Sequence, residues 1–371
     1  MLLEFKTKNF KNFQKELHFK LCDAASYDYN TDVIKDGVVN TAMVYGRNGS
    51  GKTNLGLAIF DIILHLTDKE KALEQYKPYK NLYSEDNALI EFYYKFKFDS
   101  HILEYEYAKR SPDTLAREKL SVDGKDVIYY NYETHESLLK LKGAETLNKT
   151  LTNTNISFVK YVYSNTVLDL RTTVNKTFLR FMSFVNNMLF FSSLEVNRYR
   201  GFDVGVASVP GTIVKAGKVK DFEKFLAEVA DIQYTLVSQK KDENDWIFCK
   251  FGEKLIDFYA VASRGTTSLA LFYFWLIEFE KVSLVYIDEY DAFYHFQLAK
   301  ALVERVKQFK NTQAIFSTQN TDVMTSDILR PDCYYIINNG KIDRLNDLTD
   351  KDLRKAHDLQ RMYKAGAFNV F

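Results

Sequence analysis

The sequence has few cysteines, and its charges nearly cancel. Its three cysteines, Cys22, Cys249 and Cys333, lie far apart without CxxC spacing, which argues against a disulfide framework and against a structural zinc site. Fifty Lys and Arg residues against 49 Asp and Glu residues leave a net charge of +1. The chain as a whole is therefore not drawn to nucleic acid or to an anionic membrane, and any such binding must come from a local patch.

Long apolar runs are also missing. The longest, residues 269–277 (LALFYFWLI), is about half as long as a membrane-spanning helix and is followed by Glu278. The first residues, MLLEFKTKNFKNF, carry charges throughout and do not resemble a secretory signal. With 46% hydrophobic and 27% charged residues over 371 positions, we expect a cytoplasmic globular protein that does not enter a membrane.

The patterning of the rest predicts an α/β protein. Alternating residues predict a hairpin over 3–10 and 16–22, and an antiparallel meander over 88–97, 102–109, 119–122 and 127–132. Helical spacing predicts helices over 52–66, 173–191, 219–229, 267–279 and 292–309. Apolar runs predict neighbouring strands of a core sheet over 38–45, 282–287 and 313–317, with a short strand near 334–337.

A glycine-rich turn separates the apolar run at 38–45 from the helix that follows it. Residues 46–53 (GRNGSGKT) fit the phosphate-binding pattern G-x-x-x-x-G-K-[ST] at every fixed position. In such a loop, glycines let main-chain N–H groups converge on phosphate oxygens at a helix N-terminus, where anions are favoured. A chance glycine turn before a helix is the alternative. The nucleotide reading predicts that Lys52 reaches the β- and γ-phosphates, that Thr53 binds Mg²⁺, and that the loop is completed by Asn48, Gly49, Ser50 and Gly51.

A second motif, residues 284–289 (LVYIDE), is an apolar strand that ends in two carboxylates. Acidic pairs at strand ends are common, so this motif gains weight only beside the first. Together they predict that Asp288 holds Mg²⁺ through water and that Glu289 polarises the attacking water. Hydrolysis of a nucleoside triphosphate needs these two separate roles. The metal and Lys52 stabilise charge on the phosphoryl group, while a base orients the attacking water.

The two motifs, separated by a large insertion, resemble an ABC-type ATPase head of the SMC/RecF kind. Residues 9–13 (NFKNF) are similar to the start of that group, and 316–321 (FSTQNT) lie where it has T-T-H-N-T. Residues 263–266 (SRGT) resemble a degenerate ABC signature loop, which in the family reaches the γ-phosphate bound by the opposite protomer. The resemblance thus implies that Ser263 and Gly265 complete the partner's site. Asp291 and His295 match the residues that follow the catalytic Glu in RecF- and OLD-like ATPases.

The chain departs from the family at two positions. Gln319 replaces the switch histidine, so this γ-phosphate sensor can donate a hydrogen bond but cannot become charged. With Glu289 and Lys52 as the other catalytic residues, this predicts slow hydrolysis or a nucleotide-held state. No glutamine stands where the family's Q-loop follows the insertion, and residues 164–165 (Ser-Asn) are the nearest polar pair.

The missing heptads indicate a compact head without a coiled coil. The implied fold is α/β: an ABC-type ATPase head with a P-loop core sheet, an antiparallel β-subdomain and a helical lobe. We expect the first part of the core at 1–66, the inserted meander and helical lobe at 67–200, the second part of the core at 201–345 and a C-terminal tail at 346–371. Residues 361–368 weakly resemble the L-Y-x-x-G-x-[FY] ending of AAA-annotated ATPases from bacterial phage-defence, abortive-infection and toxin operons.

One local charge bias remains. Residues 171–200 contain five cations and a single acid, Glu195; the cations are Arg171, Lys176, Arg180, Arg198 and Arg200. A solvated helix face explains them, and contact with DNA, RNA or an acidic partner is the other interpretation.

The function implied by the resemblance is a switch driven by ATP and Mg²⁺. Two heads, as a homodimer or within a higher homo-oligomer, would enclose ATP and control a separate effector protein, a toxin or nuclease, in anti-phage defence. A RecF-like DNA-repair ATPase is one alternative. A scaffold that holds nucleotide with little hydrolysis is another.

Overall fold

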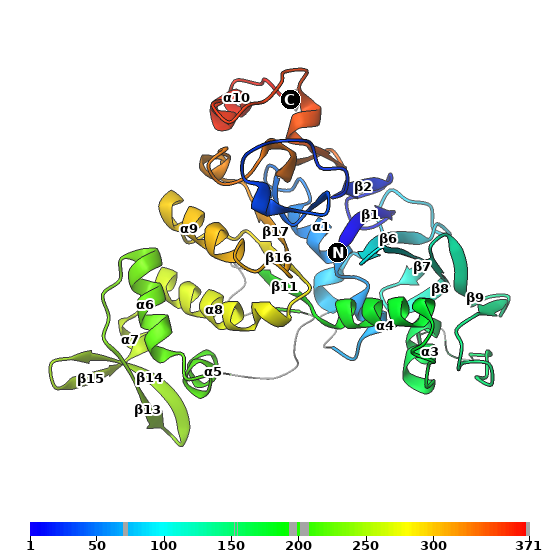
Figure 1. Cartoon of the computed structure of the whole chain (residues 1–371), viewed down its shortest axis with the longest axis horizontal. Coiled ribbons are helices and arrows are strands. Elements are labelled where there is room, and N and C mark those ends of the chain that lie inside the picture. Colours follow the sequence, from blue (N-terminus) through cyan, green and yellow to red (C-terminus); the bar gives the residue numbers. More distant parts are fainter. Residues whose placement is uncertain (70–72, 152, 154, 193–198, 201–207, 369–371) are drawn as a thin grey trace.

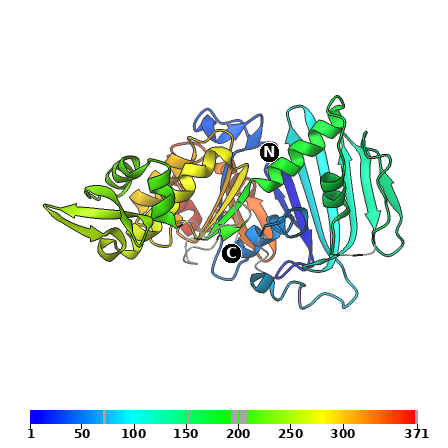
Figure 2. The same ribbon diagram turned by 90° about the horizontal axis from the view of Figure 1, so that it is seen from below.

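The computed structural model describes residues 1–69, 73–151, 153, 155–192, 199–200 and 208–368. Two seven-stranded sheets form most of the molecule, and a smaller three-stranded sheet projects at the end opposite the antiparallel one (Figures 1 and 2). No helix among these residues is long and apolar enough to cross a membrane.

The first large sheet is antiparallel, with the order β10-β9-β8-β7-β6-β1-β2. Its long strand β6 alternates between buried and half-buried positions, as expected for a sheet with one face more deeply packed than the other. The strands of this sheet are β1 (Leu2–Lys8), β2 (Leu17–Lys20), β6 (Ile90–Phe98), β7 (His101–Ser111), β8 (Thr114–Val122), β9 (Lys125–Asn131) and β10 (Ser137–Leu139). The predicted hairpin and meander are confirmed, and β1 joins them into one sheet by pairing with β6.

The second large sheet is the core, with the order β12-β11-β16-β17-β5-β18-β19. Its five central strands run parallel and four of them are buried throughout, which explains their uninterrupted apolar runs. The strands are β5 (Thr41–Tyr45), β11 (Met188–Ser192), β12 (Tyr199–Arg200), β16 (Leu284–Asp288), β17 (Gln313–Thr318), β18 (Tyr334–Asn338) and β19 (Lys341–Arg344). The predicted neighbours are confirmed, with β17 between β16 and β5.

Helices cover both sheets. They are α1 (Lys52–Ile59), α2 (Ile63–Leu66), α3 (Phe158–Asn165), α4 (Thr173–Asn186), α5 (Val209–Lys215), α6 (Val219–Ala230), α7 (Phe258–Val261), α8 (Arg264–Glu278), α9 (Phe296–Val306) and α10 (Leu359–Lys364). Short 3₁₀ turns include η4 (Thr321–Val323), and β3 (Ile34–Lys35) pairs with β4 (Val38–Val39). This mixture of a core sheet, an antiparallel sheet and packed helices confirms the predicted α/β fold class.

Three predicted helices have different bounds. The helix expected over 52–66 is interrupted between α1 and α2. The one expected over 173–191 ends at Asn186, because the apolar residues that follow form β11 and pair with β16 at the centre of the core sheet. The one expected from 292 begins at Phe296, where His295 caps it. At the end of α4, tertiary packing thus overrides a periodicity that continues in the sequence.

The three-stranded sheet was not anticipated. It consists of β13 (Leu236–Lys241), β14 (Asn244–Phe251) and β15 (Lys254–Asp257), and α5 packs against β14. Only α7 separates β15 from the signature-like loop, so this sheet lies in the chain shortly before that loop.

A buried ion pair joins the core to the antiparallel sheet. The Lys109 ammonium lies 2.7 Å from Asp61 Oδ1, and both side chains are 0% exposed. Tyr107 and Tyr79 also donate to the Asp61 carboxylate, at 2.9 and 2.7 Å. Since Asp61 follows α1 directly, this cluster ties the helix of the P-loop to the antiparallel sheet.

Candidate functional site

The glycine-rich loop runs from the end of β5 to the start of α1. Gly51, the N-cap of α1, has a φ of 109°, and a Cβ atom there would lie 2.5 Å from the Asn12 amide nitrogen. Only glycine fits this position without strain. Asn12 donates to the main-chain oxygen of Ser50 at 3.3 Å, so the 9–13 turn supports the loop. The Ser50 hydroxyl is buried and has no hydrogen-bond partner among the residues that the structure describes, so it could donate to a ligand oxygen.

Lys52 lies at the base of this loop and is only 4% exposed. Its ammonium donates to the main-chain oxygens of Gly46 and Arg47, at 3.0 and 3.5 Å. It also lies 3.2 Å from Glu289 Oε1. The expected catalytic base and the expected phosphate-binding lysine are therefore paired with each other.

Thr53 and Asp288 meet at the adjacent position. The Thr53 hydroxyl donates to Asp288 Oδ2 at 2.7 Å. Asp288 is 3% exposed, and this burial raises the pKa of its carboxyl group, while hydrogen bonds from Ser317 and Thr53 act in the opposite direction. The structure thus brings together the two side chains expected to bind Mg²⁺.

Ser317 holds both acids of the second motif. Its hydroxyl donates to Asp288 Oδ1 at 2.5 Å and accepts from the main-chain N–H of Glu289 at 3.0 Å. Glu289 has a φ of 47°, an uncommon conformation for a side chain of this size, and this hydrogen bond helps to fix it. The sequence assigned no role to Ser317, although it lies within the stretch compared with T-T-H-N-T.

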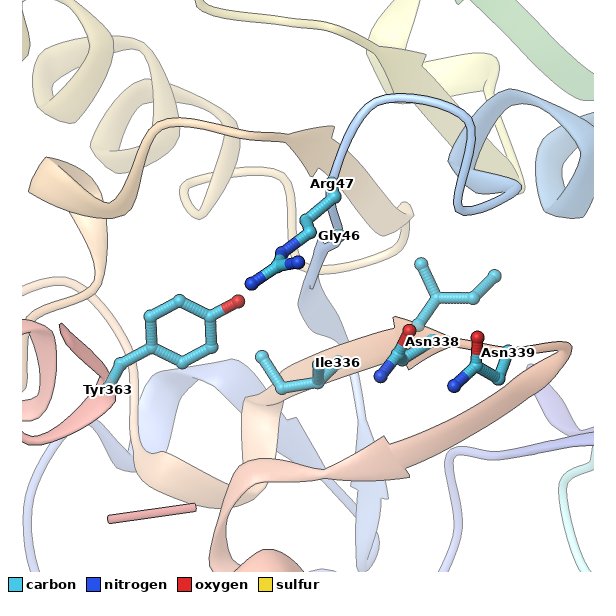
Figure 3. A pocket seen from close by; sticks show the side chains of 7 residues that line it. Gly46, Arg47, Ile336, Asn338, Asn339 and Tyr363 are labelled. Atoms are coloured by element: carbon cyan, nitrogen blue, oxygen red, sulfur yellow. The ribbon is translucent and has the colours of Figure 1, made fainter. Parts of the chain in front are cut away.

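Gln319 faces the first residues of the P-loop across a cavity of about 310 Å³. The cavity is lined by Gln319, Arg47 and Asn48, together with Tyr45, Gly46, Thr321 and Tyr363. A second cavity of about 310 Å³ lies beside it, between Arg47, Tyr363 and the end of β18 (Figure 3). Arg47 and Tyr363 were not among the predicted site residues. Tyr363 lies within residues 361–368, which weakly resemble a family ending, but that resemblance assigned it no role at the nucleotide site.

Asp291 and His295 follow the second motif. Asp291 Oδ1 accepts from the Thr318 hydroxyl at 2.7 Å. Burial raises the pKa of this carboxyl group. His295 Nδ1 accepts from the main-chain N–H of Leu298 at 3.5 Å, so this histidine caps α9.

The signature-like loop lies at the N-terminus of α8. Ser263 caps the helix by accepting from the Thr266 N–H at 3.1 Å, and Gly265 lies beside the main-chain oxygen of Phe293. No hydrogen bond or ion pair among the described residues joins Ser263 or Gly265 to the P-loop of the same chain. Next to this loop, Phe293 and Phe296 are 40% and 39% exposed.

The basic stretch is divided. Arg171 pairs with Asp169 at 2.9 Å, and Arg180 pairs with Asp99. Lys176 lies one helical turn before Arg180 on α4, so these two cations share a face. Arg198 and Glu195 lie outside the described residues, and only the backbone of Arg200 is described. The polar pair Ser164 and Asn165 ends α3, where the Asn165 amide donates to the main-chain oxygen of Tyr161.

These residues fit a nucleotide bound with a divalent cation. The loop offers main-chain N–H groups and the Ser50 hydroxyl, and Lys52 offers a cation beside them. The Thr53 hydroxyl and the Asp288 carboxylate are oxygen donors of the kind that Mg²⁺ prefers. The nucleotide would lie over the loop with its terminal phosphates toward Lys52.

A family model matches a segment in the second half of the chain. Residues 221–325 match the family model described as "AAA domain, putative AbiEii toxin, Type IV TA system". The matched segment contains the signature-like loop, Asp288, Glu289 and Gln319. The resemblance to AAA-type ATPases is thus confirmed over this part of the chain.

Several solved structures are similar at low identity. The SMC head domain from Thermotoga maritima is 13% identical, with a TM-score of 0.44, over 92% of this chain and 98% of that one. An Smc head domain with an extended coiled coil, bound to the C-terminal domain of ScpA and derived from Pyrococcus furiosus, is 12% identical, with a TM-score of 0.44, over 93% and 97%. The recombination mediator protein RecF with ATP is 15% identical, with a TM-score of 0.40, over 93% and 99%. No curated protein matches the chain.

Proposed function

We propose that this protein binds and slowly hydrolyses ATP with Mg²⁺, and that ATP binding drives the association of two heads. One observation carries the proposal: Thr53 and Lys52 of the P-loop contact Asp288 and Glu289, respectively, which come from a distant part of the chain. A phosphate-binding loop joined to a pair of carboxylates is the arrangement that phosphoryl transfer to water requires.

Each residue then has a distinct role. Lys52 and the loop N–H groups bind the β- and γ-phosphates, and the Ser50 hydroxyl adds a further donor. Thr53 and Asp288 would hold Mg²⁺, which offsets the charge of the phosphates when it is bound. Glu289 accepts the proton of the attacking water, while Ser317 keeps Asp288 and Glu289 in place.

The ion pair between Lys52 and Glu289 supports slow turnover. Before ATP can be hydrolysed, Lys52 must leave Glu289 for the phosphates, and Glu289 must turn toward water. Gln319, which is neutral, adds no charge at the γ-phosphate. These two features also favour the second candidate function, a head that holds nucleotide with little hydrolysis.

Dimerisation would complete each ATP site with residues from the partner protomer. We propose that Ser263 and Gly265 reach the nucleotide of the partner protomer, and that Phe293 and Phe296 are covered in the same interface. ATP would favour the closed dimer because only that state offers contacts to the γ-phosphate from both heads. The output would pass to a separate effector, a toxin or nuclease in anti-phage defence, and the description of the matched family supports a toxin-linked setting.

The alternative of a RecF-like DNA-binding ATPase is less well supported. Arg171 and Arg180, two of the cations expected to contact nucleic acid, are already paired with Asp169 and Asp99. The paired cations leave a weaker field for a phosphate backbone.

Phosphate release in a single turnover tests the hydrolytic function. We expect slow, Mg²⁺-dependent release by the wild type and none by Lys52→Ala or Glu289→Gln. Tight ATP binding without release would select the nucleotide-holding function, and absence of ATP binding would reject both.

Mixing two inactive variants tests the shared site. In a mixed dimer of Lys52→Ala and Gly265→Trp chains, one of the two sites has an intact P-loop and an intact signature-like loop, whereas each homodimer has none. We expect activity to reappear on mixing. If each variant is inactive alone and the mixture stays inactive, hydrolysis does not use a site shared between protomers.

A further inference from the structure

The C-terminal helix α10 packs against the segment that follows Gln319. The Gln360 amide donates to Asp322 Oδ1, and the Lys364 ammonium lies 3.6 Å from the same oxygen. Asp322 belongs to η4, which begins two residues after Gln319. Helix α10 is therefore attached to the chain three residues after Gln319, the expected γ-phosphate sensor.

This attachment places Tyr363 beside the P-loop. The Tyr363 ring lines both cavities next to Gly46 and Arg47, and its hydroxyl points toward the Arg47 guanidinium (Figure 3). The apolar side of the same space is formed by Ile336 and Ile337 of β18. Burial raises the pKa of Tyr363, so its phenol remains a neutral hydroxyl beside the guanidinium.

The cavity beside Gln319 lacks the positive charge that a histidine at that position could supply. Gln319 and Arg47 line one cavity, and Gln319 cannot carry the positive charge that a histidine there could carry. The planar guanidinium of an arginine such as Arg47 is a cation that can donate two parallel hydrogen bonds to a phosphate. Arg47 follows Gly46 directly and precedes Asn48, so it belongs to the same loop as the N–H groups that would bind the phosphates.

We propose that Arg47 binds the γ-phosphate of ATP within its own protomer, and that Tyr363 positions its guanidinium for this contact. The inference rests on the proposed ATP site and adds a phosphate-binding residue to it. In this proposal the role of α10 is to hold Tyr363 beside the P-loop, through its contacts with Asp322. Arg47 would supply the cation that Gln319 lacks.

Discrimination between ATP and ADP tests the role of Arg47. The affinities of the intact protein for ADP and for the slowly hydrolysed analogue ATPγS would be measured by calorimetry with Mg²⁺. A hydrogen bond to a charged group contributes about 1.5–3 kcal/mol, so Arg47→Ala should weaken ATPγS binding about 10- to 100-fold. It should leave ADP binding nearly unchanged, and Arg47→Lys should restore only part of the loss. Equal weakening of both nucleotides, or of neither, would overturn the proposal.

The role of Tyr363 is tested by the ratio of the affinity for ATPγS to the affinity for ADP. Tyr363→Phe removes only the hydroxyl, and Tyr363→Ala removes the ring; both should reduce the preference for ATPγS by less than Arg47→Ala does. In the Arg47→Ala background, Tyr363→Ala should cause no further loss, because it acts through Arg47. An additive loss would contradict the positioning role. Arg361→Ala, an exposed change on the same helix, is the matched control and should not alter the ratio.

Failure of this inference is distinct from failure of the ATP site. If the wild type binds neither ADP nor ATPγS, the proposed function is wrong. If it binds both and Arg47→Ala keeps the wild-type ratio, only the inference about Arg47 is wrong.

Discussion

The Thr53 hydroxyl donates a 2.7 Å hydrogen bond to the Asp288 carboxylate, although 235 residues separate them in the chain. The contact exists because β5 and β16 are parallel strands of one sheet, with β17 between them, and their carboxyl ends lie at the same edge. Ligands commonly bind at this edge of α/β sheets. The P-loop and the two acids therefore form one site.

The buried carboxyl group of Asp288 predicts a particular pH dependence. Burial raises its pKa in the folded state, so protonation begins at a higher pH than for an exposed aspartate. Because Mg²⁺ requires the carboxylate, we expect Mg²⁺-dependent nucleotide binding to weaken as the pH falls toward this raised pKa. Calorimetric titrations between pH 5 and pH 8 would measure it, with nucleotide binding in EDTA as the control for general acid effects.

The same shift affects stability. With a folded-state pKa above the unfolded value, the folded state binds the proton more tightly, so stability falls as the pH rises from the unfolded pKa to the folded pKa, and the full cost is present above the folded pKa. Asp288→Asn removes that cost. Its free energy of unfolding at pH 7, measured by urea denaturation, should equal or exceed that of the wild type, and a clear loss would show that the ionised carboxylate stabilises the fold.

Ser317→Ala should impair catalysis more than binding. It removes the hydrogen bonds that hold Asp288 and the Glu289 main chain, and a misplacement of about 1 Å can cost on the order of 100-fold in rate. We expect kcat to fall with little change in the affinity for ADP, and Ser317→Thr to recover part of the rate. Unchanged kcat in Ser317→Ala would mean that the two acids need no such support.

Glu289→Gln should trap the ATP-bound assembly. The amide keeps the size of the side chain but cannot accept the proton of water, so ATP persists and the closed state accumulates. Light scattering should report a mass of at least two chains with ATP and a lower mass with ADP. A monomer under both conditions would contradict ATP-driven association.

The buried pair of Lys109 and Asp61 should matter for stability. Lys109→Met leaves Asp61 buried without its cation, which typically costs about 3–5 kcal/mol. We expect a matching loss in the free energy of unfolding by urea denaturation. Lys97→Met, on the neighbouring strand β6 and half-buried, is the control and should change stability far less.

Local motifs predicted the centre of this site, and long-range packing produced the rest. Lys52, Thr53, Asp288 and Glu289 could be found because each lies in a short pattern that joins a strand to a turn. Ser317 has no such pattern, since its role depends on β17 lying next to β16. Arg47 stood within the motif at a variable position. Its neighbour Tyr363 comes from α10, and the weak resemblance of residues 361–368 to a family ending did not indicate that this helix packs beside the P-loop.

In the fold, too, local patterns were predictable and the effects of long-range packing were not. Alternating and apolar strands were predictable because burial on one or both faces sets their pattern directly. The end of α4 was not, because residues 188–192 continue a helical spacing but gain more as a central strand paired with β16. The small sheet of β13–β15 gave a weak signal, because most of its residues are exposed or half-buried.

The contribution of Mg²⁺ to ATPγS affinity, measured by calorimetry with Mg²⁺ and with EDTA, tests the central claim most directly. The wild type should bind ATPγS more tightly with Mg²⁺, and Thr53→Ala and Asp288→Asn should each lose that gain while still binding ATPγS in EDTA. The double variant should lose no more than either single variant, because both side chains hold the same ion, and the exposed control Asp350→Asn should behave as the wild type. If Asp288→Asn keeps the full gain from Mg²⁺, the two halves of the chain do not form one metal-nucleotide site.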